Sequence, residues 1–123
     1  NLDYELFHFT NNISEYFLKT ELAITRAGAS VTAELINCNI PFISIPYPHA
    51  ADSHQDKNAT YFEKKGYSFS VNETDVNEKL FFLIKTFYKD KKLLDSIIQK
   101  QKKHSDKEVF LKINRVIENL KNE

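Results

Sequence analysis

Two short polar segments carry residue types that could bind an anion and hydroxyl groups. The first runs from Thr25 to Glu34 and follows an apolar run, so it should lead from a strand into a helix. At such a junction, free N–H groups and the positive end of the helix dipole favour a phosphate. Gly28 lets the backbone approach closely, Ser30 can cap the helix or donate to an anion, and Glu34 could accept two ribose hydroxyls. An ordinary tight turn with Ser30 as the N-cap explains the same spacing.

The second polar segment follows another apolar run and contains four hydrogen-bonding side chains within seven positions. They are His49, Asp52, His54 and Gln55. Such side chains suit sugar hydroxyls, which need directional donors and acceptors. The two histidines and the aspartate could instead bind a metal ion, but a structural site needs a fourth ligand, and Cys38 has no supporting spacing. A solvated loop with Asp52 or Ser53 as N-cap is the third alternative.

Three apolar runs, each closed by turn residues, are predicted to form the strands that position these segments. They are Leu22–Thr25, Phe42–Ile45 and Tyr67–Val71, and we expect the first two to be buried on both faces. Helical spacing extends from Ile13 to near Thr20, over 31–38, from about Ser53 to Gly66, and through most of the chain after Val76. The pattern predicts part of a Rossmann-like α/β domain, with a parallel sheet and a helical C-terminal tail. Both polar segments should then lie at the same edge of the sheet.

Composition restricts the function further. The 123 residues suit one domain, and the balance of 17 basic and 17 acidic residues gives no field that would attract nucleic acid. A single cysteine, together with the lack of a signal peptide or an apolar run of ~20 residues, suggests the cytoplasm. The sequence contains no Met, so we expect it to be a piece of a longer protein.

Aromatic and basic residues in the second half could form a membrane or partner surface, but each group has a simpler interpretation. Phe81, Phe82, Phe87 and Tyr88 have helical spacing and are predicted to lie in the core. A basic stretch is predicted to form a solvated helix face; it consists of Lys89, Lys91, Lys92, Lys100, Lys102, Lys103 and His104. The closing helix from Asp106 is amphipathic, and we expect part of its apolar stripe to be exposed.

The runs ITRAGASVTAEL and IPFISIPYPHAADSHQDKNA together resemble the two signature segments in the C-terminal domain of the MurG family of N-acetylglucosaminyltransferases, within glycosyltransferase family 28. The resemblance covers nearly the whole chain. It implies that residues 1–123 are part of the donor-binding half of a GT-B fold, without its first strands, its glycine-rich phosphate loop and the N-terminal acceptor domain. The family inverts the anomeric centre while moving N-acetylglucosamine from UDP-N-acetylglucosamine to lipid I, giving lipid II in peptidoglycan synthesis. It needs no cofactor or metal, and the full-length protein is expected on the inner face of the cell membrane as a peripheral protein.

The resemblance also implies roles for individual residues. Glu34 corresponds to the ribose partner, and the diphosphate would lie at the start of the following helix. The full set of implied donor-binding residues is Thr10, Arg26, Gly28, Ala29, Ser30, Glu34, His54 and Gln55. Within it, Gln55 and His54 would contact N-acetylglucosamine, and the Thr10 backbone would contact uracil.

One departure and several alternatives accompany these roles. Relatives commonly have Ser-Thr-Val where this chain has Ser30, Val31 and Thr32, so a hydroxyl near the α-phosphate is missing at Val31. The general base belongs to the N-terminal domain and is not assigned. Alternatives are a stand-alone UDP-N-acetylglucosamine-binding subunit of a two-chain transferase, a small metal-binding hydrolase and a non-catalytic interaction domain.

Overall fold

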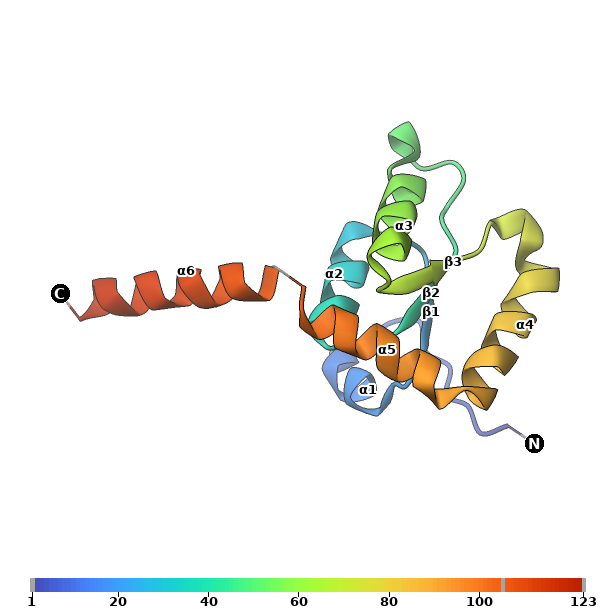
Figure 1. Cartoon of the computed structure of the whole chain (residues 1–123), viewed down its shortest axis with the longest axis horizontal. Helices are drawn as coiled ribbons and strands as arrows, with labels where there is room; N and C mark the ends of the chain where they lie inside the picture. Colours follow the sequence, from blue (N-terminus) through green and yellow to red (C-terminus); the bar gives the residue numbers. More distant parts are fainter. Residues whose placement is uncertain (1, 105, 123) are drawn as a thin grey trace.

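A parallel sheet of three strands forms the centre of the computed structural model, which describes residues 2–104 and 106–122 (Figure 1). The strands are β1 (Ala23–Thr25), β2 (Phe42–Ser44) and β3 (Ser68–Ser70), in the order β1-β2-β3. Ile24 lies opposite Ile43, which lies opposite Phe69, so these three side chains share one face of the sheet. The predicted strands and their parallel arrangement are confirmed, each being shorter than its apolar run.

Burial differs between the two strands that were predicted to be covered on both faces. All three residues of β2 are buried, as expected for a central strand. On β1, however, Ile24 is 47% exposed, so that prediction is wrong for the first strand. The reason is position: β1 has one neighbour in the sheet, and the helices that cover Ile43 leave Ile24 beside an open cavity.

One face of the sheet is covered by α2 (Ala29–Asn37) and α3 (His54–Lys65), with α1 (Ile13–Lys19) packed beside them. Leu35 and Ile36 of α2 are almost fully buried against Phe42. The short 3-10 turn η1 (Ala51–Ser53) precedes α3, which ends at Gly66 in a left-handed conformation with φ 79°. Glycine adopts this conformation at little cost, so the predicted C-terminal glycine of this helix is confirmed.

The opposite face is covered by α4 (Val76–Lys89), which follows the 3-10 turn η2 (Glu73–Asp75), and by α5 (Lys91–Lys102). Phe87 is buried against Ile43, as predicted. Phe81, Phe82 and Tyr88 are 65%, 68% and 80% exposed, so their predicted place in the core is wrong. Their side chains lie on the side of α4 that faces away from the sheet.

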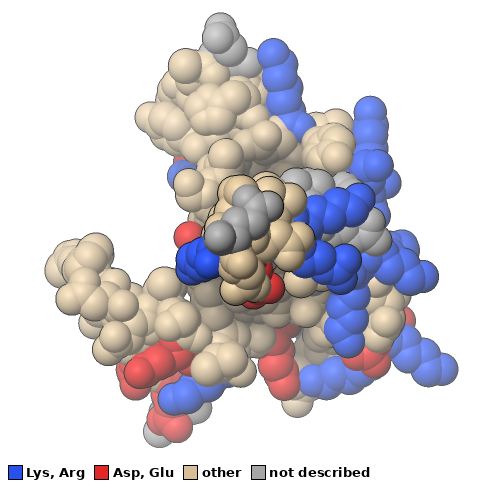
Figure 2. Space-filling view, turned by 90° about the vertical axis from the view of Figure 1, so that its left-hand side faces the viewer, with Lys and Arg blue, Asp and Glu red and all other residues tan. Residues whose placement is uncertain are grey.

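The last helix, α6 (Asp106–Lys121), projects away from the body of the molecule (Figure 1). Its described apolar side chains are exposed, as predicted for this amphipathic helix: they are Leu111, Ile113, Val116, Ile117 and Leu120. Viewed along α6, the molecule gathers many of its Lys and Arg side chains on one side (Figure 2). The lysines of α5 are exposed, in agreement with the predicted solvated face. The prediction is wrong for His104, which is buried because its ring packs edge-on against Tyr67.

Candidate functional site

Three strand-to-helix junctions meet at the carboxyl edge of the sheet. Thr25 leads through Arg26 and Ala27 to α2, Ser44 leads through Ile45 to η1 and α3, and Ser70 leads to η2 and α4. Because the strands are parallel and in register, all three chain segments leave the sheet on the same side. The predicted convergence of the two polar segments is therefore confirmed, and a third junction joins them.

The first junction presents an open helix N-terminus. Gly28 is the N-cap of α2, no side chain caps this end, and the first turn contains no acidic residue. The interpretation of Ser30 as N-cap is therefore wrong, because the helix begins one residue before it. With neither a cap nor a carboxylate, the amides and the positive end of the helix dipole are available to an anion.

Hydroxyl groups of the first junction are used differently from one another. The Thr32 Oγ1 donates to the Gly28 carbonyl at 2.7 Å, and its residue is fully buried. It therefore cannot replace the hydroxyl that is missing at the half-buried Val31. Ser30 is exposed, so its hydroxyl can reach a ligand.

Glu34 lies one helical turn beyond Ser30, and both side chains are exposed on α2. Residues four apart in a helix share a face, so the Glu34 carboxylate lies below the same N-terminus that is open to an anion. The carboxylate forms no hydrogen bond or ion pair with any residue that the structure describes. Both of its oxygens can thus accept hydrogen bonds from a ligand.

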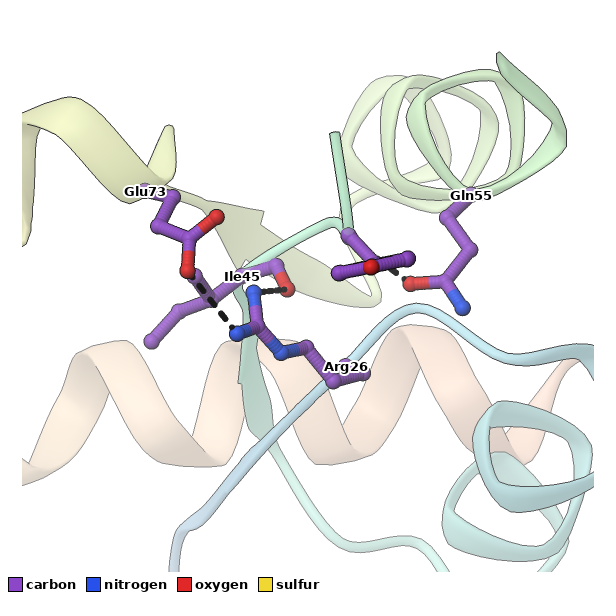
Figure 3. A network of polar contacts seen from close by, with 5 residues as sticks. Arg26, Ile45, Gln55 and Glu73 are labelled. Atoms are coloured by element: carbon purple, nitrogen blue, oxygen red, sulfur yellow. Dashed lines mark hydrogen bonds and ion pairs between the residues drawn. The ribbon is translucent and has the colours of Figure 1, made fainter. Parts of the chain in front are cut away.

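The second junction is fixed by its own side chains. Gln55 Oε1 accepts a hydrogen bond from the Tyr47 backbone N–H at 2.8 Å, which leaves the amide nitrogen of Gln55 directed away from the loop (Figure 3). His54 uses Nδ1 for a 2.7 Å contact with the Ala51 carbonyl oxygen. Each side chain therefore keeps one nitrogen, Nε2 in both residues, for a further contact.

Asn58 connects the second junction to the first. Its Nδ2 donates to the Ala27 carbonyl oxygen at 3.2 Å, so α3 lies against the loop that precedes α2. Gln55 stands three residues before Asn58 and therefore on the same side of α3. The structure in this way brings Gln55 to the side of α3 that faces Gly28.

Arg26 joins all three junctions (Figure 3). Its Nη1 donates to the Ile45 carbonyl oxygen at 3.3 Å, and its Nη2 lies 3.0 Å from Glu73 Oε1. The guanidinium carbon lies 5.7 Å from the centre of the Tyr47 ring, within reach of a cation–π contact. Both charged side chains are nearly half exposed, so this pair contributes at most about 1 kcal/mol to stability and acts mainly by orienting the loops.

Sequence reasoning missed Glu73, although a signal was present. The residue follows the third predicted strand at the position where the other two strands have their polar segments. Together with Arg26 and Ile45 it lines an open cavity of ≈ 510 Å³, which also reaches Ile24 and Asn77. The cavity therefore reaches from the carboxyl edge of the sheet to the start of α4.

Thr10 is not joined to this group by any contact in the described part of the chain. Its Oγ1 accepts a hydrogen bond from the Asn12 N–H at 3.1 Å, which forms a local turn before α1. Helix α1 in turn lines a cavity with Asn37–Ile40, at the end of α2 that is remote from Gly28.

The metal alternative finds no support in the described residues, where no three His, Cys, Asp or Glu side chains are grouped to hold an ion. His49 packs edge-on against the Tyr47 ring, with the ring centres 5.6 Å apart. The Asp52 side chain lies outside the described part of the structure.

Among the described helices, none is long and apolar enough to cross a bilayer.

Comparison with known families assigns the chain. Residues 1–113 match the model of the glycosyltransferase family 28 C-terminal domain. The chain belongs to this family. Its polar carboxyl edge is therefore the edge of a family 28 C-terminal domain, and the resemblance stated from the two signature segments is confirmed.

Curated relatives have one name in common, UDP-N-acetylglucosamine–N-acetylmuramyl-(pentapeptide) pyrophosphoryl-undecaprenol N-acetylglucosamine transferase. The protein from Pelagibacter ubique is 42% identical over 79 residues, which are 64% of this chain and 22% of that protein. The protein from Rickettsia bellii is 39% identical over 89 residues, covering 68% of this chain and 25% of that protein. The chain thus spans about a quarter of the length of these relatives.

A solved structure shows the fold. The crystal structure of Acinetobacter baumannii MurG superposes with a TM-score of 0.71 at 22% sequence identity, over 81% of this chain and 29% of that chain. The Rossmann-like arrangement predicted from the sequence is therefore that of part of the MurG structure.

Proposed function

We propose that the chain is the donor-binding part of an inverting glycosyltransferase that moves N-acetylglucosamine from UDP-N-acetylglucosamine to lipid I, giving lipid II. The observation that carries the proposal is the meeting of two polar junctions at one sheet edge within a family 28 C-terminal domain. The names of the 37–42% identical relatives supply the donor and the acceptor. The acceptor surface and the general base are assigned to the rest of the protein, which we place at the inner face of the cell membrane.

We place the donor along this edge in one orientation. Its diphosphate lies at the uncapped start of α2, against the amides of Gly28, Ala29 and Ser30. The ribose then lies over the next turn, where Glu34 accepts its hydroxyl hydrogen bonds. The sugar lies toward α3, where Gln55 donates through its free amide nitrogen.

Three further residues complete the proposed set. His54 lies next to Gln55 at the start of α3 and meets the same sugar. Arg26 holds the loop around the diphosphate through Ile45 and Glu73. The Thr10 backbone is assigned to uracil from the family resemblance alone.

During transfer, the acceptor hydroxyl attacks the anomeric carbon as the bond to the diphosphate breaks, and negative charge develops on the leaving oxygen. The uncapped amides and the dipole of α2 stabilise that charge, and they do so without reorganising. The contribution of this chain to catalysis is therefore electrostatic, together with orientation of the donor.

The test is calorimetric titration of UDP-N-acetylglucosamine against the chain and its Glu34→Ala variant. Loss of hydrogen bonds to a charged group should weaken binding by about 1 to 3 kcal/mol. Glu15→Ala is the matched control, because Glu15 is also an exposed helical carboxylate, on α1, and it should bind as the parent chain does. Unchanged affinity in Glu34→Ala, or equal losses in both variants, would contradict the assignment.

A further inference from the structure

Glu73 places a carboxylate at an edge where the proposed ligand is an anion. It is the first residue of η2, which follows β3, and its Oε1 lies 3.0 Å from Nη2 of Arg26. Like charges repel each other, so a carboxylate here weakens the attraction for a diphosphate unless it has another task. The contacts of Arg26 indicate what that task is.

Arg26 connects Glu73 to the loop that follows β2. Its Nη1 donates to the Ile45 carbonyl oxygen at 3.3 Å, and its guanidinium carbon lies 5.7 Å from the centre of the Tyr47 ring. Figure 3 shows the Arg26 side chain pointing toward Glu73. Because the guanidinium group is planar and rigid, a carboxylate that binds one of its nitrogens also fixes the direction of the other. Glu73 therefore orients the group that holds the loop.

The loop has little packing of its own to keep it in place. Pro46 and Pro48 line an open cavity of ≈ 440 Å³ together with Glu73, and Tyr47 between them is 45% exposed. A segment that borders an open cavity has few van der Waals contacts on that side. Polar contacts, those of Arg26 among them, must therefore supply the restraint.

Gln55 depends on the position of this loop. Its Oε1 accepts a hydrogen bond from the Tyr47 backbone N–H at 2.8 Å, and this bond sets the direction of the Gln55 amide nitrogen. That nitrogen is the donor proposed for the sugar. A movement of the Tyr47 backbone would turn it away from the sugar, even with Gln55 itself unchanged.

We infer that Glu73 is a positioning residue for sugar recognition, which acts through Arg26 and the Tyr47 loop to direct the amide nitrogen of Gln55. The inference rests on the proposed function, and it adds a determinant of sugar specificity at the third junction, outside the two polar segments. The side chains of Arg26 and Glu73 are nearly half exposed, so screening by water limits the expected effect on affinity to about fivefold.

Glu73→Gln tests the inference, because glutamine has nearly the same shape without the charge. Two ligands of equal charge are titrated by calorimetry: UDP-N-acetylglucosamine, and the methyl ester of UDP on its β-phosphate, which has no sugar. The variant should lose about three- to fivefold in affinity for UDP-N-acetylglucosamine relative to the methyl ester. Equal changes for the two ligands would show that the carboxylate acts only as a charge near the diphosphate, and would overturn the inference.

Asp75→Asn is the matched control. Asp75 belongs to the same turn and forms an ion pair of similar length, 3.2 Å, with Lys79 of α4. Removing this pair should leave the ratio of the two affinities as it is in the parent chain. The same change of ratio in Asp75→Asn and Glu73→Gln would assign the effect to the turn as a whole and contradict a specific role of Glu73.

A second background tests whether the effect passes through Gln55. In the Gln55→Ala variant there is no amide to direct, so the addition of Glu73→Gln should not change the affinity ratio further. If Glu73→Gln lowers the ratio equally with and without Gln55, the carboxylate reaches the sugar by another route and the inference is overturned.

Amide exchange in the ligand-free chain separates failure of the inference from failure of the proposed function. Hydrogen exchange of the Tyr47 amide should become about threefold faster in Glu73→Gln and stay unchanged in Asp75→Asn. Unchanged exchange in Glu73→Gln overturns the inference and leaves the proposed function standing, provided that the parent chain binds the donor. If the parent chain binds neither ligand, the proposed function fails, and the inference fails with it.

Discussion

Polar side chains of the proposed donor site differ in how many of their hydrogen-bonding groups the protein already uses. Both carboxylate oxygens of Glu34 are without a hydrogen bond to the described residues. In Gln55, Oε1 accepts a hydrogen bond from the Tyr47 backbone N–H, and Nε2 is available to a ligand. Arg26 is engaged with two neighbouring junctions. A ligand at this edge therefore meets groups that are already oriented, which lowers the entropic cost of binding.

Substituting Gln55 should separate recognition of the sugar from recognition of the nucleotide. In Gln55→Ala, affinity for UDP-N-acetylglucosamine should fall by about 0.5 to 1.5 kcal/mol, the usual value of one hydrogen bond, while affinity for UDP should not change. Titration of both ligands against the same variant measures the difference. If the two ligands lost the same affinity, Gln55 would act by holding the Tyr47 loop and not by contacting the sugar.

For individual residues, the sequence predicted which side chains lie at the candidate site better than it predicted the hydrogen bonds that they form. The polar clusters around Gly28 and Gln55 could be found because polar residues directly follow apolar runs. Glu73 could not be identified as a site residue in the same way, because a single carboxylate after a strand is usually an ordinary surface residue. Only the structure shows that it forms an ion pair with Arg26. The capping role assigned to Ser30 failed because the helix begins earlier than the apolar spacing indicated.

At the scale of the elements, the two glycines of the chain differ in whether the fold requires a glycine at that position. A Cβ added at Gly28 would meet only Val31 Cγ1 at 3.9 Å, and this residue has an ordinary φ of −69°. A Cβ at Gly66 would meet the flexible end of the Lys100 side chain, which can move, but the backbone there has φ 79°, a conformation that other residues rarely adopt. Gly66 therefore serves the fold, whereas the fold does not require Gly28.

Alanine at each glycine should show this difference. Gly28→Ala should leave the free energy of unfolding unchanged or raise it by up to about 1 kcal/mol, while the added methyl weakens UDP binding by roughly 1 to 3 kcal/mol. Gly66→Ala should lower the free energy of unfolding by about 1 to 2 kcal/mol. Urea unfolding and calorimetry measure the two effects, and unimpaired UDP binding by Gly28→Ala would argue against a phosphate at this turn.

Helix α5 packs on the sheet through the apolar Leu94 and Ile97, and one buried polar side chain, that of Gln101, adds hydrogen bonds. Gln101 is fully buried, and its Nε2 donates to the carbonyl oxygens of Ile40 and Tyr67 at 2.9 Å each. Gln101→Ala should lower the free energy of unfolding by about 2 to 4 kcal/mol, because it leaves buried carbonyls without a donor. Gln99→Ala, in the exposed part of the same helix, should change it by less than about 0.5 kcal/mol. Similar urea midpoints for the two variants would contradict this account of α5.

Elements were predictable from periodicity, but the orientation of neighbouring aromatic residues was not. Phe81 and Phe82 are adjacent, as are Phe87 and Tyr88, and adjacent residues in a helix point about 100° apart. Only one member of such a pair can face the core fully, and hydrophobicity alone does not say which. Packing against Ile43 and Phe69 selects Phe87 and leaves the other three rings outside.

At the scale of the whole molecule, the chain is proposed to supply one edge of a binding site and to rely on the rest of the protein for the reaction. It spans about a quarter of the length of its relatives, and its sheet has an open edge at β1, where Ile24 is exposed. An exposed edge strand favours pairing with a further strand. The donor site is thus proposed to be built largely by this chain, while the acceptor side is proposed to lie outside it.

Charge is distributed over the molecule in a way that composition conceals. Basic and acidic residues balance at 17 each, yet Lys and Arg side chains gather on one side of the body (Figure 2). The balance correctly predicts the lack of a strong overall charge, but it cannot reveal a local surface, because the arrangement of helices decides which charges become neighbours.

The central claim, that a nucleotide diphosphate binds at the start of α2, is tested most directly by amide chemical shifts of the isotopically labelled chain during titration with UDP. With the diphosphate at this turn, the largest shifts should belong to the amides of Gly28, Ala29 and Ser30, with smaller shifts at Gln55 and none along α5. Saturable shifts concentrated on α1, α5 or α6, with the three α2 amides unmoved, would contradict it.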